Sequence, residues 1–193
     1  MRDVPISIAQ KVMGAAALFA ERGLDQTKIE DVADVTGVPK ATLYYYFAGK
    51  EEILAFLLRD ALAAIADAVA IAVDADGTAR DRLLGVFASQ LQVMADQPDV
   101  CRALIADLGR AGRMPDIAKA ITAAFYAPVE QLLREGAQDG SLRGVDESTG
   151  TAVAIFGAVT ISGLSHLVLG GEVPVAGVVA RLEGLLLQGL DPR

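Results

Sequence analysis

The chain has 193 residues, of which 53% are hydrophobic and 22% are charged. This composition excludes a disordered polymer and suffices for one ordinary domain, or for a small module joined to a larger one. The formal charge of −8 lies entirely outside residues 1–50, which carry six basic and six acidic side chains, against 11 basic and 19 acidic in the remainder. The acidic residues after position 50 would repel a polyanion, so only the N-terminal end of the chain is expected to approach one.

Alanine dominates the apolar residues: the chain contains 34 alanines and no tryptophan, and only 5% of its residues are aromatic. Alanine favours helices, whereas packed sheets draw on aromatic and β-branched side chains. We therefore expect an all-α fold of about nine helices, divided by periodic apolar positions, glycines and prolines. The expected helices cover about 8–22, 28–35, 39–47, 51–72, 78–96, 98–110, 115–139, 146–169 and 174–189.

The first three expected helices are short and closely spaced. Thr27 stands three residues before Glu30, so the pair is expected to form a capping box at the start of the second helix. Gly37 supplies a sharp turn after that helix, and Pro39 opens the third. Two helices joined by a short turn that contains glycine are typical of a helix-turn-helix. The third helix carries consecutive tyrosines at 44–46, which cannot all face a core, so some of them should be exposed.

The segment TKIEDVADVTGVPKATLYYYFAGKEEIL, which starts at Thr27, resembles the DNA-binding module of the TetR family of bacterial repressors. The resemblance covers about the first 55 residues; beyond them only the length and the helical character agree. It implies a three-helix DNA-binding head over residues 1–48 and a larger helical body for ligand binding and dimerisation over 49–193. A homodimer would bind a palindromic operator in the bacterial cytoplasm, and a small-molecule inducer would release it.

The residues of the expected DNA-binding surface offer cations, a hydroxyl and amphipathic rings to groove edges and phosphates. Thr27 and Lys28 precede a helix whose N-terminal amides can receive a phosphate, and Lys50 starts the next helix. The resemblance places Lys40, Ala41, Thr42, Tyr45 and Tyr46 toward bases, Tyr44 and Lys50 toward phosphates, and Leu43 and Phe47 in the core. Glu30 departs from the basic or uncharged residue that relatives often carry at its position, so phosphate attraction should be modest.

Pro128 falls inside the expected helix 115–139, where it removes one backbone hydrogen bond and bends the helix. Such a bend can open a pocket for a largely apolar, uncharged or weakly anionic inducer, which Gln131 could help to orient. A filled core accounts for the same apolar residues equally well. The expected lining residues are Phe87, Leu91, Met94, Leu104, Leu108, Phe125, Tyr126, Val129, Leu133, Phe156, Ser162 and His166.

The segment 151–169 lies within the longest stretch of the chain without Asp, Glu, Lys or Arg. Its length just reaches that of a membrane span. Its Ser, Thr and His side chains favour a helix in a subunit interface instead, and small residues there would let two helices approach closely. We expect no membrane association. The expected dimer interface comprises Ala154, Gly157, Ala158, Gly163, Val178, Leu182, Leu185 and Leu186.

Catalysis has little support in the sequence. The single cysteine, Cys101, forms no internal disulfide and is most simply a small buried hydrophobe, and the single histidine excludes the known zinc-cluster spacings. Ser162 and His166 share a helix face but lack a third orienting group and an oxyanion site, so a polar contact explains them better. We therefore expect no catalytic, metal or cofactor site. A helical small-molecule carrier, or an adaptor that binds only protein, remains as the alternative function.

Overall fold

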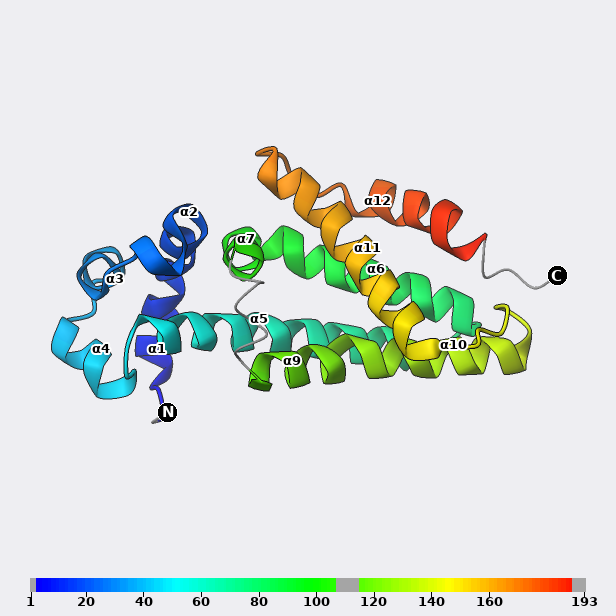
Figure 1. The fold of residues 1–193 in the computed structure, drawn as a ribbon, viewed down its shortest axis with the longest axis horizontal. Coiled ribbons are helices and arrows are strands. Elements are labelled where there is room, and N and C mark those ends of the chain that lie inside the picture. The colour runs from blue at the N-terminus through cyan, green and yellow to red at the C-terminus, as the bar shows by residue number, and fades with distance from the viewer. Residues whose placement is uncertain (1–2, 107–114, 189–193) are drawn as a thin grey trace. The chain divides into compact units, whose positions relative to one another are not determined.

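The computed structural model describes residues 3–106 and 115–188, and these are helical apart from turns and loops, as the all-α prediction expects (Figure 1). The elements in chain order are α1 (Ile6–Val12), η1 (Met13–Ala15), α2 (Ala16–Gln26), α3 (Ile29–Thr36), α4 (Lys40–Tyr46), α5 (Lys50–Val73), α6 (Ala79–Asp96), α7 (Pro98–Ala106), α9 (Pro115–Ile121), η2 (Thr122–Tyr126), α10 (Ala127–Asp139), α11 (Ser148–Val168), α12 (Val175–Leu182) and η3 (Glu183–Leu187).

The chain divides into two compact units, each with its own internal contacts. The first unit comprises Met1–Ala61 with Gln97–Ala118, and the second comprises Leu62–Asp96 with Lys119–Arg193. The first unit therefore contains more than the expected head of residues 1–48, because it includes the first part of α5 and also α7, which packs against α2. The packing of α7 there has no signal in the local sequence, because it depends on a contact between segments about 80 residues apart.

The turn between α3 and α4 gives the first unit its helix-turn-helix. Gly37 ends α3 in the left-handed conformation, with φ of 63°, which glycine adopts without steric cost. The hydroxyl of Thr36 donates to the carbonyl of Val32 at 2.7 Å and accepts from the amide of Val38 at 3.3 Å. These bonds satisfy groups that a helix end otherwise leaves unpaired, so the turn that the sequence predicted has a fixed geometry.

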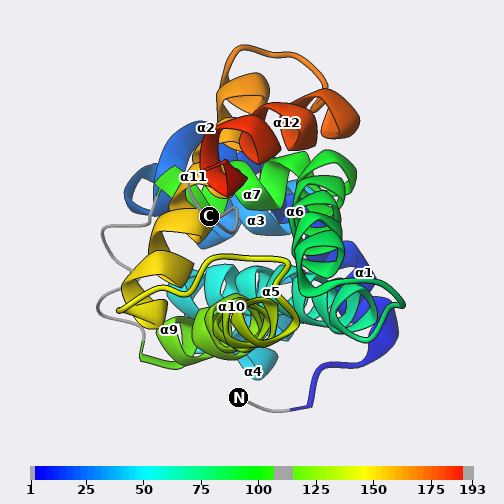
Figure 2. The ribbon, with the colours of Figure 1, turned by 90° about the vertical axis from the view of Figure 1, so that its right-hand side faces the viewer.

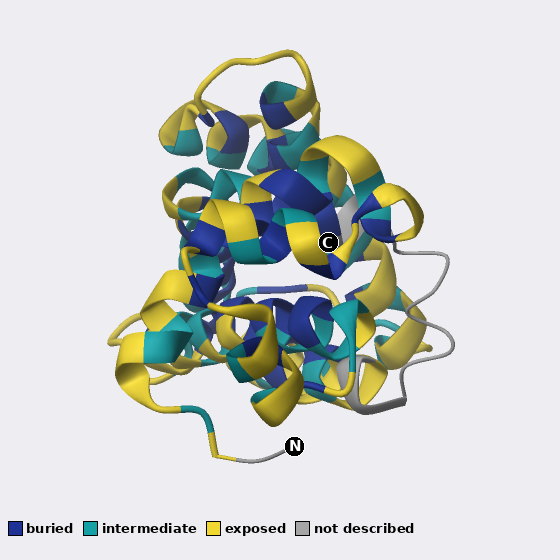
Figure 3. Cartoon of the chain, turned by 90° about the vertical axis from the view of Figure 1, so that its left-hand side faces the viewer, coloured by how far each residue is buried: buried dark blue, intermediate teal, exposed yellow. Residues whose placement is uncertain are grey.

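The core of the first unit lies between these helices. Leu43 and Phe47 are 0% and 1% exposed, so their predicted core positions are confirmed. Phe47 also makes an edge contact with the ring of Phe56 on α5, with 5.6 Å between the ring centroids. Figure 3 shows how buried and exposed residues alternate along the helices, as expected when each helix turns one face to a core.

The start of α3 differs from the predicted capping box. The amide of Lys28 donates to the Asp31 carboxylate at 3.0 Å, so the acidic partner lies one residue later than predicted. Thr27 is fully buried, and its hydroxyl donates to the carbonyl of Gly23 at 2.7 Å. That carbonyl belongs to the residue that breaks α2, with φ of 68°. Thr27 therefore joins the end of α2 to the start of α3. The sequence predicted that its side chain would be at the surface, and this prediction is wrong.

The second unit is built around the second part of α5, with α6, η2, α10, α11 and α12 (Figures 1 and 2). Pro128 lies near the start of α10, directly after the π-helical turn η2. The amide of Ala127 reaches back five residues to the carbonyl of Thr122. This wider turn accommodates the proline, which cannot donate a hydrogen bond, so the predicted distortion is realised as a π turn.

Among the described residues, one helix is long and apolar enough to cross a membrane, judged by length and composition alone. This helix is α11, whose mean hydropathy is 1.7. Only 28% of its most apolar window is buried inside the chain. The buried positions, Ala152, Ile155, Val159, Gly163 and Leu167, recur every three or four residues and form one face. The remaining faces of this uncharged helix are consequently left at the surface or only partly covered.

We predict that Thr27→Val destabilises the first unit by about 1–3 kcal/mol, because valine keeps the shape of threonine but leaves the Gly23 carbonyl without its donor. Urea unfolding followed by tyrosine fluorescence measures this change, since three of the four tyrosines lie on α4. Thr149→Val, at an exposed position, is the matched control and should change stability by less than about 0.5 kcal/mol. Unchanged stability in Thr27→Val would show that its hydroxyl has no structural role.

Candidate functional site

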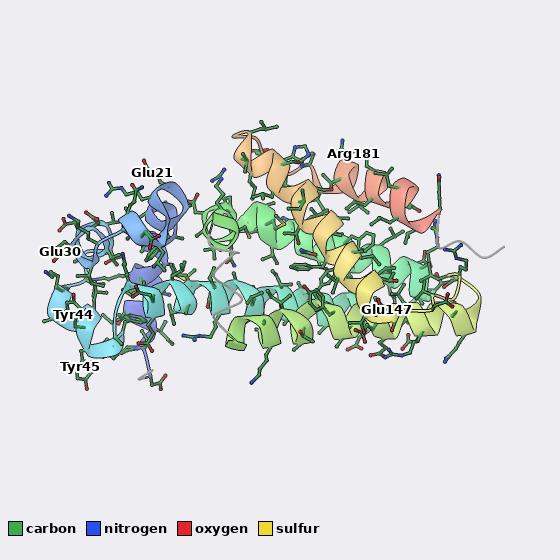
Figure 4. The ribbon with its side chains drawn as sticks, in the orientation of Figure 1. Glu21, Glu30, Tyr44, Tyr45, Glu147 and Arg181 are labelled. Atoms are coloured by element: carbon green, nitrogen blue, oxygen red, sulfur yellow. The ribbon has the colours of Figure 1, made fainter. Side chains whose placement is uncertain are left out.

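One face of α4 carries four of the nine residues that the sequence assigned to DNA recognition. Lys40, Ala41, Tyr44 and Tyr45 are exposed, and their spacing places them along one side of the helix opposite buried Leu43. The two tyrosines are 55% and 58% exposed, and both are labelled on α4 in Figure 4. Large aromatic side chains with such exposure are available for a partner, so this face is the main candidate for nucleic-acid contact.

Two other predicted base-contacting residues are only partly accessible. Thr42 and Tyr46 have intermediate exposure, on the side of α4 that turns toward the core. The ring of Tyr46 meets the ring of Tyr45 edge to face, with 4.9 Å between centroids and an interplanar angle of 88°. Tyr46 therefore supports the orientation of Tyr45.

Lys50 holds the head together. Its Nζ donates to the backbone carbonyl of Asp25 at 3.0 Å and to that of Thr27 at 2.9 Å. These carbonyls belong to the link between α2 and α3, so Lys50 ties the start of α5 to that link. Two of the three ammonium donors are used in this way. The predicted phosphate contact of Lys50 stays a prediction, beside a structural role that the sequence did not indicate.

A surface hollow of about 350 Å³ lies between the N-termini of α3 and α5 and the side of α4. The N-terminal amides of a helix attract anions, and Lys28 is exposed beside them. Two carboxylates, those of Glu30 and Glu51, line the same hollow. The hollow thus lies beside two helix N-termini, and its two lysines and two glutamates give it a balanced charge. Its lining residues are Thr27, Lys28, Ile29, Glu30, Tyr44, Ala48, Gly49, Lys50 and Glu51.

Lys40, the first residue of α4, forms an ion pair and hydrogen bond with Glu30 of α3. This hydrogen bond is the main cause that lowers the pKa of the Glu30 carboxyl and raises the pKa of Lys40. Both groups therefore remain ionised around neutral pH, and the pair carries no net charge. The sequence predicted that Glu30 would be used in a capping box, so this contact between two helices was missed.

Cys101 and His166 lie in separate units and have no link to each other. Cys101 is 5% exposed, and burial raises the pKa of its thiol to about 11, so the thiol stays protonated and unreactive at neutral pH. Nε2 of His166 lies 3.3 Å from the guanidinium of Arg181, which joins α11 to α12 (Figure 4). The sequence led us to expect a polar contact of His166 in a pocket or a subunit interface; the observed contact joins two helices of the same chain.

Three aromatic residues of the predicted ligand pocket contact one another. Phe125 and Phe156 meet edge to face with 5.1 Å between centroids, and Tyr126 contacts Phe156 in the same way at 5.3 Å. Four members of the predicted pocket are partly exposed: Tyr126, Phe156, Ser162 and His166. The Leu104 side chain and Leu108 lie outside the described residues. The remaining members are buried, at most 2% exposed: Phe87, Leu91, Met94, Phe125, Val129 and Leu133. Buried side chains line an enclosed pocket as well as a filled core, so the predicted pocket stays a prediction at these six positions.

A cleft of about 440 Å³ lies beside Pro128 and is lined by none of these six residues. Small apolar side chains form its walls, and Gln131, Arg134 and Asp74 supply polar groups. Alanines gave no pocket signal in the sequence because they are common throughout the chain. The lining residues are Ala66, Ala70, Val73, Asp74, Ala123, Ala127, Pro128, Gln131 and Arg134.

The predicted dimer interface also needs correction. Gly163, Val178 and Leu182 are buried inside the chain itself, and a Cβ at Gly163 would lie 2.8 Å from the sulfur of Met94. Ala154 is exposed, and Gly157, Ala158 and Leu186 are partly exposed. The large apolar side chains left at the surface of this region are Val153, Ile161, Val168, Leu169 and Leu185, of which only Leu185 was predicted.

Comparison with known proteins places these observations in a family. Residues 12–56 match the family described as bacterial regulatory proteins, tetR family. The HTH-type transcriptional repressor KstR2 of Mycobacterium tuberculosis is 39% identical over 80 residues, an alignment that covers 42% of this chain and only 40% of that relative.

Two solved structures share the fold over nearly the whole chain. The fatty acid degradation regulator FadR from Bacillus halodurans has a TM-score of 0.85 at 19% identity, with all of both chains covered. FadR from Bacillus subtilis, in complex with stearoyl-CoA, has a TM-score of 0.78 at 19% identity, with 93% of this chain and 98% of that chain covered. Residues 12–56 thus match the N-terminal domain of the tetR family of bacterial regulatory proteins, and the chain shares the helical fold of the two solved regulators.

Proposed function

We propose that the chain is a ligand-responsive transcriptional repressor that binds a palindromic operator as a homodimer in the bacterial cytoplasm. The single observation that carries the proposal is the exposed face of α4, with Lys40, Ala41, Tyr44 and Tyr45 presented by a helix-turn-helix. An α-helix fits the major groove of DNA, where base edges carry a distinct pattern of donors and acceptors. Lys28, beside the α3 N-terminus, then contacts a phosphate.

In this proposal, the second copy of the chain in the homodimer covers the apolar surface of α11, α12 and η3. Val153, Ile161 and Val168 are separated by eight and seven residues, so they lie on one side of α11. Leu169 and Leu185 are 85% and 78% exposed, which is unfavourable for an isolated chain in water. A two-fold axis sets the same patch against itself, and it presents two heads to two half-sites of a palindrome.

The effector occupies the cleft beside Pro128 and carries both an apolar part and a polar or weakly anionic group. The alanine walls admit the apolar part, and Gln131 and Arg134 orient the polar group. The FadR protein of similar fold that was solved with stearoyl-CoA supports a ligand of this mixed character. Release of DNA then requires that the effector bind the released form more tightly, because equal affinity for both forms shifts nothing.

We predict that Ala41→Glu weakens binding to a selected duplex by at least about tenfold, because it brings a carboxylate to the DNA-facing side of α4. The duplex is obtained by enrichment from a random-sequence library with the full-length protein, and affinity is measured by fluorescence anisotropy. Ala17→Glu, at an exposed position of α2, is the matched control with the same change of charge and size. Equal affinities for both variants and the parent would remove α4 from the DNA-contacting surface.

We predict that Leu185→Glu converts the protein to a folded monomer at micromolar concentration, because the carboxylate would be buried at the apolar interface. Sedimentation equilibrium gives the mass, and circular dichroism shows whether the helices remain. Ile71→Glu makes the same change at another exposed apolar position, 75% exposed on α5, and should leave the mass unchanged. A parent protein that sediments as a monomer, or a dimeric Leu185→Glu variant, would contradict the proposed interface.

We predict that Ala70→Phe abolishes the response to an effector while DNA binding persists, because the ring fills the cleft beside Pro128. Saturated fatty acids and their acyl-CoA thioesters, stearoyl-CoA among them, are the probes, and the readouts are Tm and release of the selected duplex. Ala63→Phe, exposed on α5 outside the cleft, is the matched control. An unaltered response in Ala70→Phe would place the effector elsewhere.

A further inference from the structure

The ion pair between Lys40 and Glu30 lies on the face of the head that is proposed to meet DNA. Lys40 is the first residue of α4, and Glu30 lies in the first turn of α3. Their side chains are 48% and 55% exposed, so neither is enclosed and both remain accessible to a partner. Figure 4 shows Glu30 at the same end of the head as Tyr44. Most surface ion pairs contribute little, so this one matters only through what it does to DNA binding.

Glu30 is held by more than Lys40. A carboxylate in the first turn of a helix is stabilised by the positive end of the helix dipole, and α3 begins at Ile29. The hydrogen bond with Lys40 further lowers the pKa of the Glu30 carboxyl, so this group stays charged at neutral pH. The carboxylate is therefore a fixed anchor for the ammonium of Lys40.

The anchored ammonium differs from a free one in two ways. A free lysine at the start of a recognition helix is a mobile point charge that any phosphate can attract, whatever the sequence. When it is paired with Glu30, the net charge of the two groups is zero, so this attraction is largely lost. One of three ammonium donors is used by Glu30, and the other donors remain for acceptors on a base edge.

We infer that Glu30 is a specificity-determining residue of the head: it cancels the attraction of Lys40 for phosphates and directs its ammonium toward a guanine edge in the major groove. The inference rests on the proposed operator binding. The O6 and N7 acceptors of guanine are the base-edge groups that a lysine recognises. Residues 1–50 carry no net charge, so the head gains little from non-specific attraction and the direction of this one cation matters more.

The test compares the enriched duplex with a scrambled duplex of the same composition, over a range of salt concentrations. Glu30→Gln should strengthen binding to the scrambled duplex by about five- to tenfold at low salt, and should steepen the salt dependence by about one unit of slope. The ratio of specific to non-specific affinity should fall. Glu21→Gln removes the same charge from α2 and is the matched control, for which we expect less than about twofold change in that ratio.

Two further variants separate the inference from simple repulsion between Glu30 and DNA. Glu30→Asp keeps the charge and should retain most of the discrimination of the parent. In a Lys40→Met background, Glu30→Gln should no longer strengthen binding to the scrambled duplex, because there is no cation to release.

The same gain with and without Lys40 would show that Glu30 only repels phosphates, and would overturn the inference. An unchanged affinity ratio in Glu30→Gln would also overturn it, while leaving operator binding intact. Failure of the parent protein to enrich any duplex would overturn the proposed function together with this inference.

Discussion

The left-handed turn at Gly37 is the constraint on which the head depends. It lets α3 end and α4 begin within a few residues, and the bonds of Thr36 to Val32 and Val38 fix its geometry. With that turn fixed, burial of Leu43 determines which side of α4 remains outside. The exposure of Tyr44 and Tyr45 and the meeting of α3 with α4 at the ion pair both follow from these two conditions.

The head carries equal numbers of basic and acidic side chains in residues 1–50. Three of its cations make bonds within the protein: Lys50 to two carbonyls, Lys40 to Glu30, and Arg22 to Asp31 at 3.4 Å. A surface of this kind attracts the DNA backbone weakly, so shape and hydrogen bonding to bases must supply a larger part of any affinity. The acidic balance of the rest of the chain points in the same direction, because it penalises non-specific approach to a polyanion.

The sequence predicts local features of this protein better than contacts between distant segments. The glycine turn follows from residue types at short spacing, and the core positions of Leu43 and Phe47 follow from the family resemblance; both are confirmed. The predicted capping box failed by one residue, because Glu30 and Asp31 are adjacent carboxylates and only the helix geometry selects Asp31. Periodicity gives the apolar side of a helix without saying what covers it, so core, pocket and subunit interface could not be separated in residues 87–186.

Helix α11 shows why composition alone cannot settle that last question. A helix without charged side chains over most of its length has the same pattern whether it crosses a membrane, lies in a core or forms an interface. The structure divides it: Ile155 and Val159 pack inside the chain, whereas Val153, Ile161 and Val168 stay outside. A second apolar surface beside a completed core is what two-fold packing of identical chains requires, because each copy must fold before it can present the patch. The exposed apolar side chains of α11 are the observation on which the proposed dimer rests.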